Sequence, residues 1–230
     1  MINNINILNS AYFSLILQLI IGIICVFGIF IPLKNKDNVL TDILILETIV
    51  QFIEFTFYFW LITQFSKINY EVTFVRYFDW FITTPTMLIS IIIFMIYQNS
   101  LNETNNDPIN FYKEFIENMN TIVYILLFNA LMLIFGFLGE IKLLNKKLSF
   151  IFGFIFFFLS YYLIFSNYVN NNINNTFLFI INFVLWSLYG IAYLFTYKNK
   201  NISYNILDIF SKNLNGLFLF FYIIYLYYNE

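Results

Sequence analysis

The sequence has no histidine, a single cysteine, three prolines and few charged residues, which make up 10% of the chain. The absence of histidine excludes histidine metal sites, Ser-His-Asp triads and histidine proton relays. Cys25 cannot form an internal disulfide, and its place in an apolar run indicates a small buried hydrophobic residue. With a net charge of −2 and no basic tail or block, the chain lacks the features of a nucleic-acid-binding protein.

Apolar and aromatic side chains, in contrast, make up 61% and 23% of the 230 residues. Soluble domains are about half apolar and about a quarter charged, so this composition predicts an integral membrane protein surrounded by a lipid bilayer. A helix needs about 20 apolar residues to cross a bilayer. Seven stretches of the sequence are candidates, at 10–32, 40–64, 73–97, 119–141, 148–167, 176–197 and 202–228.

Polar segments separate these seven stretches. The longest separator, 98–110, contains Pro108, and the function of the wider loop predicted at 98–118 is open. The neutral, polar start MINNINILNS is unlike the basic start of a signal peptide. We therefore predict an all-α fold, with one domain of seven transmembrane helices over residues 1–230 and no appended soluble domain.

The lysines in the separators bear on the orientation of this bundle. Basic loops tend to stay in the cytoplasm. If the N-terminus is outside, the cytoplasmic loops hold Lys34, Lys36 and Lys113. The outside loops then hold twice as many, namely Lys67, Lys142, Lys146, Lys147, Lys198 and Lys200. The lysine count alone therefore favours a cytoplasmic N-terminus.

Six ionisable residues of the predicted spans are candidates for charges at membrane depth. An unpaired charge at this depth costs several kcal/mol, so each one is a candidate functional residue. They are Glu47, Glu54, Arg76, Asp79, Asp208 and Lys212. Glu140 lies near a helix end, where its side chain can reach the membrane surface, and we interpret it as structural.

Asp208 and Lys212 are four residues apart in LDIFSK and so share one face of the last helix. The simpler interpretation is a salt bridge that offsets the cost of two buried charges. In the alternative, Lys212 is a nucleophile that condenses with an aldehyde, because an apolar pocket favours the uncharged amine. The Schiff base, once protonated, needs a carboxylate counter-ion, which Asp208 or Asp79 can supply.

The stretch RYFDWFITTP at 76–85 resembles the third helix of the microbial rhodopsins, which are seven-helix retinal proteins. The family motif Arg-Tyr-x-Asp-Trp-x-x-Thr-Thr-Pro stands here as Arg76, Tyr77, Asp79, Trp80, Thr83, Thr84 and Pro85. The seventh-helix motif Asp-x-x-x-Lys stands as Asp208 and Lys212. The resemblance covers all seven predicted spans.

This resemblance implies a photoreceptor without enzymatic activity that carries all-trans retinal on Lys212 as a protonated Schiff base. Asp79 and Asp208 form the counter-ion, and Arg76 links them to water on the outer side. Thr83 hydrogen-bonds Asp79, and Trp80 and Trp186 enclose the polyene. The N-terminus lies outside and the C-terminus in the cytoplasm, which conflicts with the lysine count.

Further matches to the family lie on the fourth and sixth helices. They are the retinal-pocket candidates Met132 and Gly136, with Gly139 beside them, and the aromatic wall of Trp186, Tyr189 and Tyr193. Thr84 on the third helix is also expected at the retinal. Gly190 stands where the family usually has a proline. Aromatic and glycine stripes alone are weak signals, since most such stripes serve packing.

Polar residues at helical spacing run along four spans. On the first, second, third and seventh predicted helices they include Ser10, Ser14, Gln18, Glu47, Gln51, Glu54, Tyr58, Thr83, Thr86, Ser90, Asn205, Asn213 and Asn215. Polar groups at membrane depth face protein or water, so these stripes can line one wet path. Interhelical hydrogen bonding is the alternative, which we favour for Ser10, Ser14, Gln18 and Asn215 taken singly.

Two glutamates on one face of one helix favour a function over packing, because each charge is costly. Glu47 and Glu54 are about 10 Å apart at 1.5 Å per residue, which suits two successive gates. At the position of the family's usual proton donor the chain has Ser90, which cannot hold and release a proton near neutral pH. The pattern is most similar to the first group of viral rhodopsins, which are light-gated cation channels.

We therefore predict a retinal-binding, light-gated cation channel with Ser14, Glu47, Gln51, Glu54, Ser90, Asn205 and Asn213 in the ion pathway. The alternatives are an outward proton pump and a photosensor that moves no ions. We expect Glu54→Gln to change ion selectivity or gating more than colour, and Asp79→Asn to shift colour strongly. Ion selectivity and association with further copies of the chain stay open.

Overall fold

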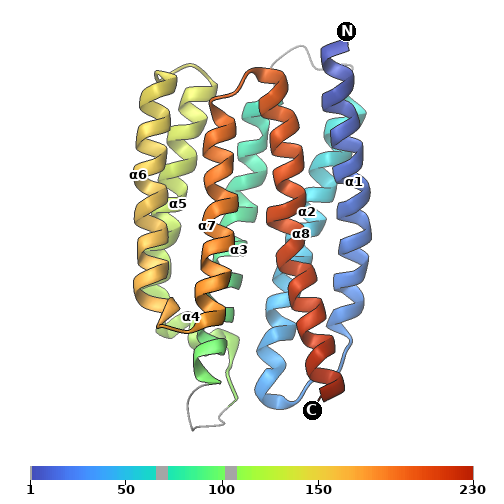
Figure 1. The fold of residues 1–230 in the computed structure, drawn as a ribbon, viewed down its shortest axis with the longest axis vertical. Helices are drawn as coiled ribbons and strands as arrows, with labels where there is room; N and C mark the ends of the chain where they lie inside the picture. The colour runs from blue at the N-terminus through green and yellow to red at the C-terminus, as the bar shows by residue number, and fades with distance from the viewer. Residues whose placement is uncertain (1, 66–71, 102–107, 230) are drawn as a thin grey trace.

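The computed structural model describes residues 2–65, 72–101 and 108–229. Within these ranges every regular element is a helix, as the composition predicts, because helices satisfy their own backbone hydrogen bonds inside a lipid bilayer. The long helices run side by side along the longest axis of the molecule, and the two termini lie at opposite ends (Figure 1). Lys67 and residues 102–107 of the predicted loop at 98–118 lie outside the described residues.

The described elements correspond to the predicted spans with some additions. The long helices are α1 (Ile2–Ile29), α2 (Asn38–Gln64), α3 (Arg76–Ser100), α5 (Met119–Glu140), α6 (Lys146–Ile164), α7 (Ile173–Tyr193) and α8 (Tyr197–Asn229). The short helix α4 spans Phe111–Glu117, the 3-10 turns η1 and η2 span Asn35–Asp37 and Val72–Val75, and the π-helical turn η3 spans Phe165–Val169. The prediction of an all-α membrane bundle is confirmed.

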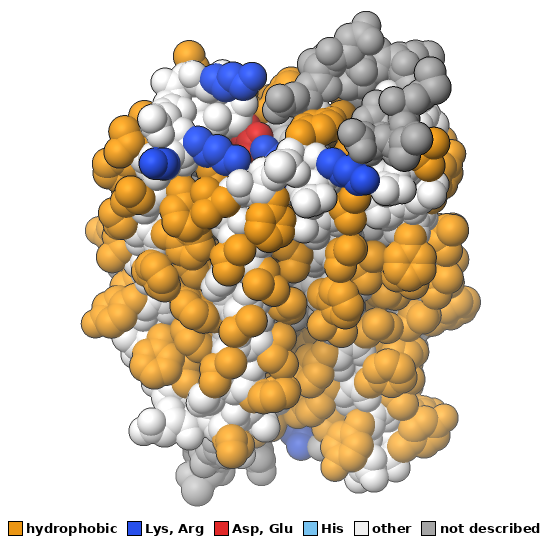
Figure 2. Space-filling view, turned by 45° about the horizontal axis from the view of Figure 1, so that its top comes forward, with side chains coloured by type: hydrophobic (Ala, Val, Ile, Leu, Met, Phe, Trp, Pro, Cys, Tyr) orange, Lys and Arg blue, Asp and Glu red, His pale blue; other side chains and the backbone are white. Residues whose placement is uncertain are grey.

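Six of the described helical segments are long and apolar enough to cross a membrane, and α2 is not among them. The 27 residues of α2 include Asp42, Glu47 and Glu54. This helix nevertheless lies within the bundle, in contact with α1, α3 and α8. Hydrophobic side chains cover the sides of the molecule, as expected for surfaces in contact with lipid (Figure 2).

Several predicted helix boundaries were wrong because polar residues at span ends continue the helix. The first helix starts at Ile2 rather than residue 10, and the last starts at Tyr197 rather than residue 202. The predicted loop 98–118 also contains helical residues, since α3 continues to Ser100 and α4 follows Pro108. The Asn110 side chain caps α4 by accepting a hydrogen bond from the Lys113 backbone N–H at 3.0 Å.

The helix α3 is the central one. In its most apolar window 67% of the residues are buried, against 22–28% in α1, α5, α6 and α7. Pro85 inside it has no N–H and so leaves the carbonyl four residues earlier without its helical partner. Thr83 and Thr84 donate to the carbonyls of Asp79 and Trp80, one turn earlier in the same helix, at 3.1 and 2.8 Å.

Candidate functional site

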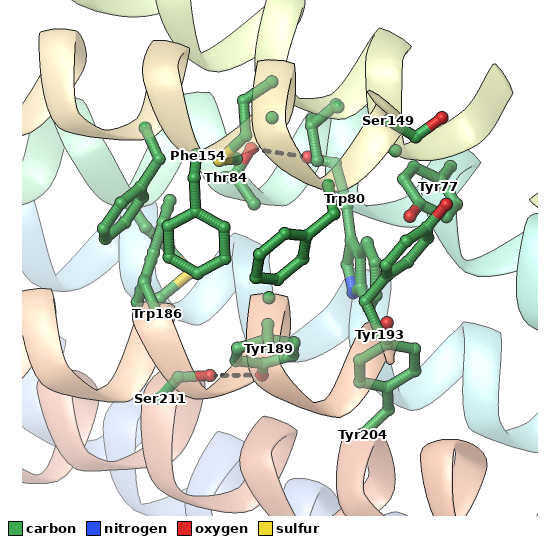
Figure 3. Close-up of a pocket in the computed structure, with 18 of the residues that line it drawn as sticks. Tyr77, Trp80, Thr84, Ser149, Phe154, Trp186, Tyr189, Tyr193, Tyr204 and Ser211 are labelled. Carbon is green, nitrogen blue, oxygen red and sulfur yellow. Dashed lines mark hydrogen bonds between the residues drawn. The ribbon is translucent and has the colours of Figure 1, made fainter. Parts of the chain in front are cut away.

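A cavity lies in the middle of the bundle, between α3, α5, α6, α7 and α8. Its volume is about 110 Å³. All the side chains predicted to contact retinal line it: Trp80, Thr84, Met132, Gly136, Trp186, Tyr189, Tyr193 and Lys212. Figure 3 shows most of these side chains around the cavity.

Aromatic rings form much of the cavity wall. The ring of Trp80 packs edge-on against Tyr189 and Tyr204, with centroids 5.5 and 5.0 Å away. Trp186 packs against Tyr161 at 6.0 Å. Edge-to-face packing of this kind holds each ring in a fixed orientation, and the exposed ring faces suit a flat conjugated ligand.

Two glycines leave room for neighbouring aromatic side chains. A Cβ atom at Gly136 would lie 2.6 Å from the Tyr77 hydroxyl, so a larger residue there would push Tyr77 aside. A Cβ atom at Gly190 would overlap the Phe154 ring, which lines the same cavity. Gly139, which the sequence places beside these pocket residues, does not line the cavity.

The side chain of Lys212 reaches the cavity from α8 and meets carboxylates from three helices. Its Nζ lies 2.9 Å from Asp79 Oδ2 and 3.8 Å from Asp208 Oδ1. Its Nζ also forms an ion pair with Glu54 Oε1 on α2. Each of these four side chains is at most 3% exposed. We call Lys212, Glu54, Asp79, Asp208 and Arg76 the charge cluster.

Arg76 and two tyrosines hold Asp208 in place. Arg76 NH1 lies 3.3 Å from Asp208 Oδ2. The hydroxyl of Tyr58 donates to Asp208 Oδ2 at 2.6 Å, and the hydroxyl of Tyr189 donates to Oδ1 at 2.7 Å. The Arg76 guanidinium also donates to the side-chain oxygen of Asn205. Asp208 is thus a fixed, fully hydrogen-bonded carboxylate, whereas Asp79 Oδ1 has no hydrogen-bond partner among the described residues.

The position of Glu54 differs from the sequence prediction. We predicted a neutral group of Lys212, Arg76, Asp79 and Asp208, with Glu54 at a separate gate. The structure brings Glu54 to Lys212 itself. Three carboxylates then face two cations, so the fully ionised cluster has a charge of −1, which a low-dielectric site disfavours. The cluster therefore requires one further proton or one bound cation.

Thr83 also departs from its predicted contact. Its hydroxyl donates to the backbone carbonyl of Asp79 at 3.1 Å rather than to the Asp79 carboxylate. The cause is the helical geometry beside Pro85, where a threonine bonds the carbonyl one turn earlier. Thr86, which the sequence placed on the polar stripe of α3, bonds the Ile82 carbonyl instead in an exposed position.

Polar side chains of α1, α2, α3 and α8 form a column beside the charge cluster. Ser14 donates to the Asn205 carbonyl at 2.7 Å, and the Gln51 amide donates to the Lys212 carbonyl at 2.8 Å. Farther along, Glu47 and Ser90 line a small second cavity together with Asn215. The side chains of Ser90 and Glu47 hydrogen-bond each other. Both ends of the Gln18 and Asn213 amides have no hydrogen-bond partner within the described residues.

Sequence reasoning missed three residues of the site. Asn129 donates to Thr84 Oγ1 at 2.8 Å, Ser211 pairs with the Tyr189 hydroxyl at 2.6 Å, and Tyr204 packs on Trp80. Helical spacing in the sequence could have identified two of these three residues. Asn129 lies three and seven residues before Met132 and Gly136, and Tyr204 lies one turn before Asp208, so each shares a face with a predicted site residue.

Comparisons with known proteins agree with this geometry. The sequence profile described as bacteriorhodopsin-like protein matches residues 9–226. The viral rhodopsin OLPVRII is 32% identical, with a TM-score of 0.81 over 94% of this chain and 97% of that one. No curated protein sequence matches the chain significantly.

More distant solved structures share the fold. The proton-pumping rhodopsin AR2 of the marine alga Acetabularia acetabulum is 17% identical, with a TM-score of 0.75 over 98% of this chain and 97% of that one. Bromide-bound halorhodopsin of Halobacterium salinarum is 13% identical, with a TM-score of 0.75 over 99% and 96%. Because the profile spans nearly the whole chain, this protein belongs to the bacteriorhodopsin-like family of microbial rhodopsins.

Proposed function

We propose that the protein is a light-gated cation channel whose retinal is bound covalently to Lys212. Membership of the family implies a retinal chromophore and a light-driven transporter or photoreceptor. The cavity fits this group, because it combines flat aromatic walls with one buried amine and adjacent carboxylates. Retinal bound there would supply light absorption and a change of shape.

The contact between Glu54 and Lys212 carries the proposal. Glu54 belongs to α2, whose Gln51 and Tyr58 form part of the polar column. In this proposal the ion pair keeps the column closed, and a movement of the Lys212 nitrogen breaks it. Asp79 lies 2.9 Å from the same nitrogen and can accept its proton. A single event at Lys212 thus changes both the charge and the hydrogen bonds of the column.

The chemistry of the column favours cations. Carboxylates along a pore attract cations and repel anions. Glu54 and Glu47 supply two of them, separated by two helical turns, and the amides and hydroxyls between them can replace water around an ion. The small cavity lined by Glu47, Ser90 and Asn215 marks the part of the column where a water molecule would be accommodated.

Voltage clamp on illuminated cells that express the protein tests this function. A passive cation channel gives a photocurrent that reverses sign at the equilibrium potential of the permeant cation. We expect the reversal potential to change with the cation gradient and to be independent of the chloride gradient. A current that stays outward at every voltage would show a pump, and a visible pigment without any current would show a photosensor.

An outward proton pump is the second candidate, and one observation favours it. Ser90 stands at the family's usual donor position, but Glu47 of the neighbouring helix lines the same small cavity. A carboxylate is thus present near that position after all and can return a proton toward Lys212. Pumping would make the photocurrent outward against a proton gradient, whereas the channel would carry it down the gradient.

We also propose that the N-terminus lies outside, which is the orientation that the resemblance to the family implies. Cys25, the sole cysteine, is fully buried and gives no background in thiol labelling. Lys147 and Lys113 are exposed at opposite ends of the bundle. We expect a membrane-impermeant maleimide added to intact cells to label Lys147→Cys and to spare Lys113→Cys. The reverse pattern would show the inverted orientation that the lysine count favours.

A further inference from the structure

An open cleft lies on the N-terminal face of the bundle, between the turn from α5 to α6 and the turn from α7 to α8. Lys142 and Lys146 line it from the first turn, and Lys200 lines it from the start of α8. Lys142 adopts a left-handed backbone conformation with φ 62°, at a helix end where glycine is usual. Figure 2 shows this face, where lysine side chains gather around an acidic one.

The charge of the cleft is positive. Lys200 binds both oxygens of Glu140 at 2.7 and 2.6 Å, and both side chains are buried. Lys142 and Lys146 form no ion pair within the part of the chain that the structure describes. Lys146 donates only to the backbone carbonyls of Leu194 and Phe195, at 3.3 and 3.5 Å. The three lysines and one glutamate therefore leave two positive charges for an anionic ligand.

A buried tyrosine lies beside the lysines of the cleft. Tyr193 lines the cleft and is 5% exposed. Its hydroxyl hydrogen-bonds the side chain of Ser149 on α6. The ammonium groups of Lys146 and Lys200 lie 5.5 and 5.8 Å from the centre of its ring. The ring of Tyr193 thus lies close to both cations, and the uncompensated charge of the cleft is what calls for an anionic ligand.

Apolar side chains beside the lysines indicate where this anion comes from. Leu143 and Phe195 also line the cleft, and they are 75% and 44% exposed. The cleft lies where α5 and α7 end and α6 and α8 begin, which is the level of lipid headgroups. A free phosphate ion would leave these apolar groups in water. We propose that the cleft binds the phosphate of an anionic phospholipid, with its glycerol and acyl part against Leu143 and Phe195.

The full-length protein in a neutral detergent provides the test. Native mass spectrometry compares phosphatidylglycerol with phosphatidylcholine of the same acyl chains. The wild type should retain phosphatidylglycerol selectively, and the double variant Lys142→Gln with Lys146→Gln should bind it about thirtyfold more weakly. Lys147→Gln is the matched control, because Lys147 is exposed on the same face but does not line the cleft. This variant should bind like the wild type.

Two further measurements keep the proposal falsifiable. Phosphatidylglycerol should raise the thermal unfolding midpoint of the wild type but not of the double variant, which must unfold at the wild-type temperature without lipid. Inorganic phosphate at the same concentration should leave the lipid bound. Complete displacement by phosphate would show a site for free anions, and equal binding of both lipids, or of phosphatidylglycerol by the double variant, would equally overturn the proposal.

Discussion

Replacement of Lys212 by alanine should abolish the visible absorbance band that the wild type gains when all-trans retinal is added. Among the described lysines, Lys212 alone lines the central cavity, so no other described amine can take over the covalent bond. The expected effect is complete loss of the band rather than a shift. Absorbance spectra of the purified proteins, recorded before and after retinal addition, measure it directly.

Lys212→Arg separates the covalent bond from the charge. Lys212→Ala leaves three buried carboxylates facing Arg76 alone, so this variant can also lose stability. Arginine keeps the positive charge but does not condense with an aldehyde, and it should also give no band. Lys113→Ala, which removes an exposed lysine at the end of the bundle, should form the pigment normally. A visible band in folded Lys212→Arg would show that retinal is attached elsewhere or not covalently.

The second large effect is a shift of the absorbance band, which we expect when Glu54 is replaced by glutamine. At the 2.9 Å between Lys212 Nζ and Asp79 Oδ2, and with an effective dielectric constant near 20, the Coulomb attraction between a carboxylate and a cation is about 6 kcal/mol before the cost of desolvation. With retinal bound to Lys212, as proposed above, loss of a carboxylate beside the nitrogen would raise the energy of the ground state more than that of the excited state, in which positive charge lies farther from the nitrogen. Because Glu54 and Asp79 both contact Lys212 Nζ, Glu54→Gln and Asp79→Asn should both shift absorbance to longer wavelength by similar amounts.

This expectation revises the one drawn from the sequence, where Glu54→Gln was predicted to change ion passage more than colour. The structure places both roles, the effect on colour and the effect on ion passage, on the carboxylate of Glu54. We therefore also expect Glu54→Gln to lower the cation photocurrent about tenfold, the factor that about 1.4 kcal/mol of lost cation stabilisation produces. Spectra and photocurrents of the same variants measure the two effects separately.

Glu47→Gln is the matched control for colour. Glu47 lies on the same helix two turns from Glu54 and has no ion pair with Lys212 among the described residues. The Glu47→Gln variant should have an altered photocurrent and the absorbance band of the wild type. If Glu54→Gln keeps the wild-type spectrum while Asp79→Asn shifts it, Glu54 lies outside the charge cluster and acts only on ion passage.

Much of the protein could be predicted from its sequence. Long apolar runs can only form helices in lipid, so composition and length determined the bundle. The motif spacing in RYFDWFITTP and LDIFSK determined the family and the pairing of Lys212 with Asp79 and Asp208. Helical spacing also placed the retinal-pocket candidates on the faces that line the cavity.

Only the tertiary structure decided which helix faces meet. Helical periodicity gives the face on which Glu54 lies, but not which side chain of α8 stands opposite, because helix rotation and tilt depend on packing between helices. The same packing decided that Tyr58 and Tyr189 bind Asp208, and that Asn129 reaches Thr84. It also brought Lys142, Lys146 and Lys200 from two separate turns to one cleft, since distances between loops follow from the helix ends that carry them.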